Sequence, residues 1–313
     1  MADMEAAAPQ TDLPGTGPET GLETGLAAML DPIERGQLAE SMAWFRARLV
    51  PGGRFRSRLK PDEDPRLLLI CMTPRSGSTA LSGLMLATGA LGRGGERLNR
   101  HSGFLSRVIA ATPPRSLRHL LEMVIRSSRS ANGVAQIKAD LPQLLPFLAD
   151  PACFDLLRRA GIVYLTRENV LAQAISRYRG IQTGVWHAAA KGQAADPGTD
   201  PGTDRGPDRG ADVPFDHAAI AGQIDRIAGM MACYERLFAR LGLQPLRITY
   251  EQIAADPGAV LGRIAALAGV DPALAGQAAS LDDGGFRRVS GRNNDELRDR
   301  FLAENRRHLV AGG

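Results

Sequence analysis

LLLICMTPRSGST, residues 67–79, is the stretch of sequence that decides the fold. Residues 67–72 are all apolar and lie between polar neighbours, a pattern typical of a strand buried on both faces of a parallel sheet. Residues 73–79 form a short loop that contains a glycine, and the apolar spacing of residues 80–86 predicts a helix directly after it. A strand, a tight loop and a helix in this order open a nucleotide-binding α/β domain.

Three further strands are expected, at residues 133–139, 162–166 and 246–250. Helical patterns separate them, and the clearest spans residues 220–241, where apolar residues recur at helical spacing. This alternation predicts a P-loop-like, three-layer α/β/α fold around a central, mainly parallel sheet.

The chain is expected to form one domain, residues 30–313, after a disordered tail of residues 1–29. The tail is rich in Pro, Gly and Thr, so it cannot bury enough apolar surface to offset the entropy of ordering. A first helix is expected from residue 32 to about residue 49, with Ile33 among its apolar contacts. A disordered insertion is expected at residues 192–214, because Asp-Pro-Gly-Thr and related repeats give this segment a four-residue period that cannot form a packed core.

The composition argues against several classes of protein. The net charge of +4 requires no polyanion-binding surface, so no nucleic-acid partner is expected. The three cysteines show no CxxC spacing, which argues against a zinc site and a disulfide framework and favours a reducing cytoplasm. The N-terminal residues lack the basic start and apolar centre of a secretory signal, and no stretch reaches the ~18 apolar residues of a membrane span.

The loop at residues 73–79 has the chemistry of a phosphate-binding site. A loop that enters a helix N-terminus directs several backbone N–H groups to one point, as a phosphate requires. Gly77 allows close approach of the backbone, and Arg75 adds a positive charge. The loop is not a Walker A sequence, which counts against an ATP-dependent kinase, and an ordinary capped turn is the structural alternative. The candidate cofactor-binding residues here are Thr73, Pro74, Arg75, Ser76, Gly77, Ser78 and Thr79.

A second anion site is expected where the strand at residues 162–166 ends. Arg167 follows that strand directly, at the edge of the sheet where α/β folds place their ligands, and Ser176 lies in the helix that comes next. The two side chains converge on one phosphate if the helix folds back over the end of the strand. Taken singly, they are equally consistent with a surface arginine and an ordinary helix serine.

Taken together, these segments resemble the PAPS-dependent sulfotransferases, and most of all the bacterial trehalose 2-sulfotransferase type. The loop at residues 73–79 matches the family form Thr-x-Arg/Lys-Ser-Gly-Ser/Thr-Thr. Residues 165–176 and 182–187 are similar to the paired patterns Leu-Thr-Arg-x-Asp-x-x-x-Gln-Ala-x-Ser and Gln-Thr-Gly-x-Trp-His, with Asn169 in place of Asp. The resemblance extends from about residue 65 to residue 301 and is weakest near its C-terminal end.

This resemblance implies 3′-phosphoadenylyl sulfate (PAPS) as the donor and no metal ion. The loop after the first strand would hold the 5′-phosphosulfate of PAPS, and Arg167 and Ser176 would hold its 3′-phosphate, with Arg288 as a further contact. The implied acceptor is a hydroxyl group of a carbohydrate or glycolipid. The family type often forms homodimers, so a homodimer is expected.

Sulfuryl transfer is an in-line displacement at sulfur, so the protein must position the acceptor oxygen, take its proton and neutralise charge on the departing phosphate. Arg75 and Lys138 are the candidate cations, and a structural ion pair at a strand end is the alternative role of Lys138. The resemblance offers two general bases. Glu96 occupies the position of the trehalose-type glutamate, and Asp140 that of the histidine of the cytosolic group. Glu96 is preferred because the longer motifs are of the trehalose type, although Gly94 replaces the proline of that motif.

Trp186 and His187 are candidate acceptor-binding residues, since an aromatic face suits a sugar ring and an imidazole hydrogen-bonds hydroxyl groups. Packing of Trp186 against the core fits its position equally well. Two other classes of function remain: a P-loop nucleotide kinase or hydrolase, and a non-catalytic protein that binds the nucleotide. The sulfotransferase interpretation requires that the two anion sites face one nucleotide.

Overall fold

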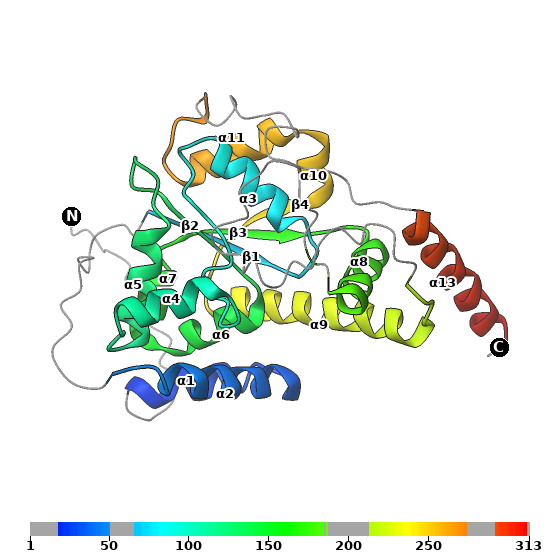
Figure 1. Cartoon of the computed structure of the whole chain (residues 1–313), viewed down its shortest axis with the longest axis horizontal. Coiled ribbons are helices and arrows are strands. Elements are labelled where there is room, and N and C mark those ends of the chain that lie inside the picture. Colours follow the sequence, from blue (N-terminus) through cyan, green and yellow to red (C-terminus); the bar gives the residue numbers. More distant parts are fainter. Residues whose placement is uncertain (1–17, 51–65, 185, 187–212, 274–291, 312–313) are drawn as a thin grey trace, which may run out of the picture.

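The computed structural model describes residues 18–50, 66–184, 186, 213–273 and 292–311. Its centre is a four-stranded sheet in the order β2-β1-β3-β4, and each neighbouring pair of strands is parallel (Figure 1). The strands are β1 (Leu67–Met72), β2 (Ala135–Ala139), β3 (Gly161–Thr166) and β4 (Leu246–Thr249). The expected three-layer α/β/α fold around a parallel sheet is confirmed.

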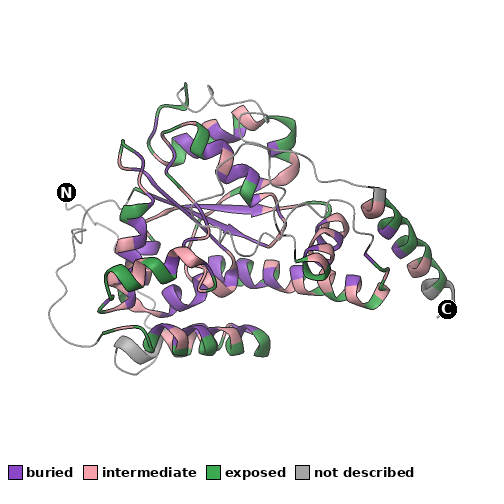
Figure 2. Ribbon diagram, viewed as in Figure 1, coloured by how far each residue is buried: buried purple, intermediate pink, exposed green. Residues whose placement is uncertain are grey.

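Strand β1 divides the core into two layers. All of its side chains are buried, and they alternate between the two faces of the sheet. One face packs against the helices drawn above the sheet in Figure 1: α3 (Ser78–Ala87), α10 (Tyr250–Ala255) and α11 (Pro257–Leu267). The other face packs against the layer below it: α4 (Gly103–Ala111), α5 (Leu117–Ser127), α6 (Leu141–Ala149), α7 (Pro151–Leu157) and α9 (His217–Arg240). Figure 2 shows the buried sheet between the inner faces of these helices.

The N-terminal boundary differs from the expectation. Residues 18–27 form helix α1 (Pro18–Ala27), which packs on α6 and α7, so the expected disordered tail of residues 1–29 is wrong for this part. The physical reason is that Leu26 of α1 and Leu30, which follows the helix, are both buried in the core. The average composition of the segment hides such a pair. Residues 1–17 lie outside the described residues.

Helix α2 (Pro32–Arg46) begins where the sequence predicts and ends earlier. Asp31 caps it, and Glu34 completes a reciprocal capping box with the Asp31 backbone. Its buried face carries Leu38, Met42 and Phe45. The expected apolar contact of Ile33 is wrong, because Ile33 projects from the outer face of the helix and is 61% exposed.

Three helices pack at the edge of the sheet around a smaller hydrophobic cluster. Helix α8 (Val170–Thr183), the start of α9 and helix α13 (Arg292–Ala311) contribute to it. Val213 is buried in this cluster, and the Tyr178 hydroxyl donates to the carbonyl oxygen of Pro214 at 2.6 Å. The insertion expected at residues 192–214 is therefore wrong at its C-terminal end. Its repeats lie outside the described residues.

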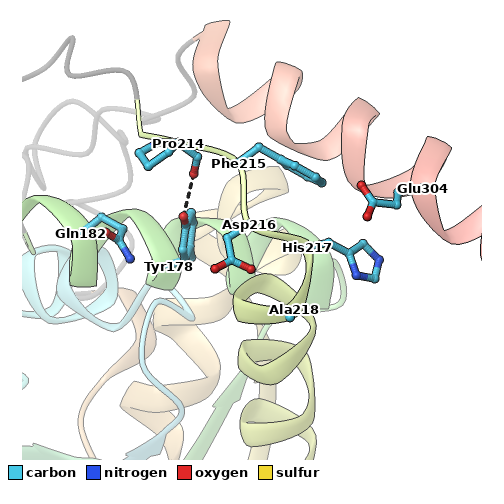
Figure 3. Close-up of a pocket in the computed structure, with 8 residues that line it drawn as sticks. All are labelled: Tyr178, Gln182, Pro214, Phe215, Asp216, His217, Ala218 and Glu304. Carbon is cyan, nitrogen blue, oxygen red and sulfur yellow. Dashed lines mark hydrogen bonds between the residues drawn. The ribbon is translucent and has the colours of Figure 1, made fainter.

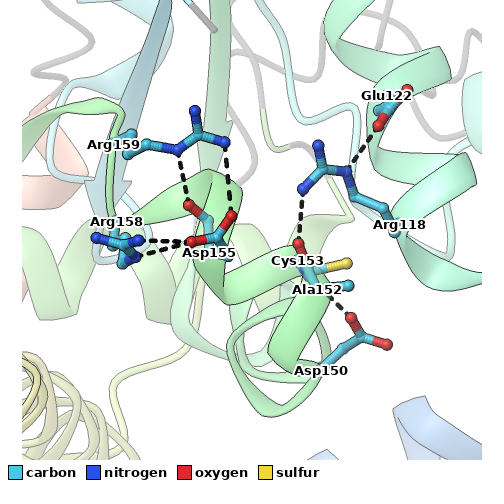
Figure 4. A network of polar contacts seen from close by, with 8 residues as sticks. All are labelled: Arg118, Glu122, Asp150, Ala152, Cys153, Asp155, Arg158 and Arg159. Atoms are coloured by element: carbon cyan, nitrogen blue, oxygen red, sulfur yellow. Dashed lines mark hydrogen bonds and ion pairs between the residues drawn. The ribbon is translucent and has the colours of Figure 1, made fainter. Parts of the chain in front are cut away.

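A network of polar contacts connects α7 to the neighbouring helix α5 and to the residues that follow α7 (Figure 4). The Arg118 guanidinium binds Glu122 on its own helix and the Ala152 carbonyl oxygen of α7. Asp155 binds both Arg158 and Arg159 at the end of α7.

All three cysteines are buried free thiols. None of the helices in the described ranges is long and apolar enough to cross a bilayer.

Candidate active site

The phosphate loop leaves β1 and enters α3 through Gly77. Gly77 is the N-cap residue of α3, its φ of 92° is left-handed, and it gives the helix no side-chain cap. Helices α2 and α4 to α11, in contrast, each begin at a residue whose side chain accepts a hydrogen bond from the first turn. The Ser76 hydroxyl is buried without a hydrogen-bond partner among the described residues. The first turn of α3 therefore has the open amide groups of an anion site.

Arg75 extends from this loop toward α8. Its backbone φ of 68° is left-handed, which is uncommon for a residue with a side chain. Its Nε donates to Ser176 Oγ at 2.9 Å, and its guanidinium also donates to the Trp186 carbonyl oxygen. Ser176 is thus in direct contact with the phosphate loop, so the two expected anion sites adjoin each other.

Three arginines from three elements gather at this junction. Burial lowers the pKa of Arg75 most, and the positive charges of Arg167 and Arg179 lower it further. Arg167 follows β3 and stacks on the Tyr250 ring, with 4.7 Å between the guanidinium carbon and the ring centre. Arg179 lies on α8 and donates to Asn294 Oδ1 at 2.8 Å. A bound anion would relieve the repulsion among these cations.

Gln173 joins α8 to the start of the phosphate loop. Its Nε2 donates to Thr73 Oγ1 at 2.8 Å and to the Pro74 carbonyl oxygen at 2.7 Å. Both Gln173 and Thr73 are fully buried. These bonds fix the loop against the helix that carries Ser176.

Helix α10 fixes the same region from the other side. A Cβ atom on Gly77 would lie 2.6 Å from Cδ2 of Tyr250, so the ring covers the loop at the one position without a side chain. The Glu251 carboxylate accepts the backbone N–H groups of Glu168 at 3.0 Å and Asn169 at 3.4 Å. The Tyr250-Glu251 pair therefore positions both the phosphate loop and the residues that follow Arg167.

Lys138 lies between the phosphate loop and a carboxylate. It is 1% exposed, its Nζ donates to Thr79 Oγ1 at 3.3 Å, and the same nitrogen lies 3.9 Å from Glu96 Oε1. Glu96 Oε2 accepts hydrogen bonds from Asn99 and Gln143. This network places Glu96 at the first turn of α3.

Asp140 joins the same cluster. It caps α6 by accepting the Gln143 backbone N–H at 3.1 Å. Burial raises the pKa of the Asp140 carboxyl to about 7, and the neighbouring Glu96 carboxylate contributes to the rise. The two candidate bases are therefore neighbours in one cluster.

A glycine-rich loop delivers Glu96 to this position. The Lys138 backbone N–H donates to the Gly95 carbonyl oxygen at 3.1 Å, which pins the loop along β2. A Cβ atom on Gly94 would lie 2.2 Å from Cδ of Gln136, whose Nε2 is held by Ser82 Oγ at 2.9 Å. This contact leaves no room for a side chain at residue 94.

An open groove of about 640 Å³ lies where α8, α9 and α13 meet (Figure 3). Tyr178 and Gln182 line it from α8, together with Asp216, His217 and Glu304. Helical spacing places Tyr178 and Gln182 on the face of α8 opposite Gln173 and Ser176. The groove is therefore separate from the phosphate loop.

The comparisons with known proteins bear on this arrangement. Residues 129–304, more than half of the chain, match the family model described as Stf0 sulphotransferase. The chain belongs to the Stf0 sulphotransferase family. A comparison with curated proteins gave no match. Membership of the Stf0 sulphotransferase family makes the protein a transferase that moves a sulfuryl group to an acceptor.

The part of this Stf0 sulphotransferase that matches the family model contains Lys138, Asp140, Arg167 and Ser176. The phosphate loop and Glu96 precede that part, and the fold brings them to it through Arg75 and Lys138. Ser176 contacts Arg75 directly, and the convergence of Arg167 and Ser176 on one phosphate stays a prediction. Arg288 and His187 lie outside the described residues.

Trp186 packs against α8, next to the arginine junction. A Cβ atom on Gly180 would lie 3.0 Å from the Trp186 ring. The ring is half-buried, so packing and a contact with an acceptor both fit this geometry.

Sequence reasoning missed several residues of the site. Gln173 belongs to the motif at residues 165–176. Because it precedes Ser176 by three residues, the spacing indicates that the two side chains share one face of the helix. From the sequence, no role was assigned to Tyr250, Glu251, Arg179 or Asn99. Among the residues that the structure describes, no group of three or more His, Cys, Asp or Glu side chains could hold a metal ion.

Proposed function

We propose that this Stf0 sulphotransferase transfers the sulfuryl group of PAPS to a hydroxyl group of a carbohydrate or glycolipid by in-line displacement. The observation that carries the proposal is the position of Lys138, whose Nζ contacts Thr79 of the phosphate loop and lies 3.9 Å from Glu96. One cation thus connects the anion site to a carboxylate base, which is the pairing that sulfuryl transfer requires.

The residues present fit a nucleotide with phosphates at two positions. The uncapped first turn of α3 and the buried Ser76 hydroxyl suit the 5′-phosphosulfate. Arg75, Arg167 and Ser176 suit the 3′-phosphate, because the cations crowd together beside the loop. When bound, PAPS supplies an activated sulfuryl group on a phosphate that leaves as an anion.

The residues around the phosphate loop then have separate roles in the transfer reaction. Glu96 takes the proton of the acceptor hydroxyl, while Asn99 and Gln143 hold the carboxylate in place. Lys138 Nζ and the amide groups of α3 neutralise the charge that develops on the departing phosphate. Asp140 is the second base candidate because it lies beside Glu96 in the same cluster.

The acceptor class follows from the trehalose-type motifs and from Trp186. The Trp186 backbone lies beside the phosphate loop, since its carbonyl oxygen accepts a hydrogen bond from Arg75, and the ring lies against Gly180 of α8. An aromatic face in this position suits the apolar face of a sugar ring. The same resemblance leads us to expect a homodimer.

Isothermal calorimetry tests the donor assignment. We expect adenosine 3′,5′-bisphosphate (PAP), the product of the donor, to bind and ATP with Mg²⁺ to bind far more weakly, because only PAP uses both anion sites. Arg75→Ala should weaken PAP binding by about tenfold or more, since it removes a charge-assisted contact. Preference for ATP with Mg²⁺ would favour a nucleotide kinase and contradict the proposal.

A transfer assay with labelled PAPS tests the base. Glu96→Gln should lower the transfer rate by roughly 10²- to 10⁴-fold and leave PAP affinity unchanged. Glu235→Gln is the matched control, because Glu235 pairs with Arg247 at the surface. A Glu96→Gln variant with the wild-type rate would move the role of base to Asp140.

A further inference from the structure

Two arginines with no role in the donor sites lie close to Asp140, the neighbour of the proposed base. The first is Arg177, on α8. Gln173 and Ser176 of this helix contact the phosphate loop, and helical spacing places Arg177 on the same face. Arg177 therefore faces the carboxyl edge of the sheet, where the reacting groups gather.

The second is Arg226, on α9. Arg226, Met230 and Tyr234 form one stripe of that helix, and the Tyr234 hydroxyl donates to the last carbonyl oxygens of β1 and β2. Helix α9 leads into β4, which is parallel to its neighbour, so its earlier residues lie beyond the carboxyl ends of the strands. Arg226 precedes Tyr234 by two turns, or about 12 Å. It therefore reaches over the same edge.

The two arginines lie close enough to Asp140 and to each other to interact electrostatically. Burial lowers the pKa of Arg177 most and the charge of Arg226 lowers it further, whereas Asp140 opposes the change. Both arginines also act on the pKa of Asp140. Arg177 Nε is buried and has no hydrogen-bond partner among the described residues.

The charges of this cluster do not balance. Lys138, Arg177 and Arg226 carry positive charge, against the carboxylates of Glu96 and Asp140. Asp140 is only partly ionised at neutral pH because burial raises its pKa to about 7. A surplus of positive charge therefore remains beside the proposed base.

We propose that Arg177 and Arg226 form an acceptor subsite for a negatively charged group. The acceptor is then an acidic hydroxyl compound, one that carries a carboxylate, phosphate or sulfate near the hydroxyl to be sulfated. This inference rests on the proposed function, because the position of Glu96 defines where the acceptor hydroxyl lies. The phosphates of the donor are already served by the α3 amides and by Arg75, Arg167 and Ser176.

Calorimetry on the PAP-loaded full chain tests the subsite. The probes are methyl glucoside and its charged relatives, methyl glucuronide, methyl glucoside 6-phosphate and methyl glucoside 6-sulfate. We expect at least one charged probe to bind about tenfold or more tightly than the neutral glucoside. Arg177→Gln and Arg226→Gln should each remove that preference and leave PAP affinity within about twofold. Arg240→Gln is the matched control, because Arg240 is an exposed arginine of α9.

Equal binding of the neutral and charged probes, or binding of none of them, overturns the subsite while PAP binding by the same sample upholds the donor site. A loss of PAP affinity in Arg177→Gln or Arg226→Gln also overturns it, since the arginines then serve the donor. Absence of PAP binding in the wild-type protein contradicts the proposed function itself. Loss of the charge preference in Arg240→Gln would show a general charge effect and so also count against the subsite.

Discussion

Asp140 links local burial to the pH dependence of the whole protein. The pKa of its carboxyl is raised to about 7, first by burial and then by Glu96, so the folded protein holds this proton more tightly than the unfolded chain. The resulting stabilisation is present below about pH 4 and is lost as the pH rises through 7. The free energy of unfolding of the wild type, relative to Asp140→Asn, should therefore fall by about 2 kcal/mol between pH 5 and pH 7.

Denaturant unfolding at several pH values measures this difference. Asparagine keeps the cap of α6, so the comparison isolates the charge. Glu96→Gln should make this fall smaller and complete it at a lower pH, because removing the neighbouring carboxylate lowers the pKa of Asp140. If the difference in free energy of unfolding between the wild type and Asp140→Asn stayed constant over this pH range, the raised pKa of Asp140 would be contradicted.

Lys138 allows two roles to be told apart. Lys138→Met keeps the apolar stem of a residue that is 1% exposed and removes its charge beside Glu96. The transfer rate should fall by about 10²-fold or more, because charge on the departing phosphate loses a donor. Near-normal turnover together with lowered stability would instead identify Lys138 as half of a structural ion pair.

The position of the phosphate loop depends on helix α8. Gln173→Leu has nearly the same volume and removes the hydrogen bonds to Thr73 and Pro74. PAP affinity should fall by about tenfold, because each bond contributes about 1 kcal/mol. Gln182→Leu, on the opposite face of α8, is the control and should bind PAP as the wild type does. Equal affinities for all three proteins would show that the loop keeps its shape alone.

These elements differ in how well their structure and contacts could be predicted from the sequence. The run at residues 67–72 and the loop after it could be predicted, since the signal lies within a few neighbouring residues. The contact of Arg75 with Ser176 joins residues 101 positions apart, so it depends on how α8 packs. The meeting of Glu96 and Asp140 depends likewise on the path of a glycine-rich loop along β2. Helix α1 was missed because burial of Leu26 depends on contacts with α6 and α7.

The hydrophobic core of the protein is divided into clusters of unequal size. Two large clusters enclose the sheet, whereas a third, smaller cluster connects α13 to α8 and the start of α9. Helix α13 lies at the periphery of the protein, beyond α8 (Figure 1). Phe301 and Leu297 bury α13 there, and Phe301 stacks on His217 with 4.6 Å between ring centres. We expect a helix held by so few buried contacts to open independently of the sheet.

Phe301→Ala should therefore loosen α13 and leave the sheet intact. Truncation of a buried phenylalanine removes about 3 kcal/mol of packing, which corresponds to roughly a hundredfold faster amide exchange within α13. Hydrogen–deuterium exchange should show this change in α13 and the start of α9, with β1 and β3 protected as before. Leu302→Ala is the control, because Leu302 is exposed on the same helix. PAP affinity should fall modestly, since Asn294 of α13 holds Arg179 beside Arg75. A uniform loss of protection across the sheet would show instead that the edge cluster and the two large clusters unfold as one unit.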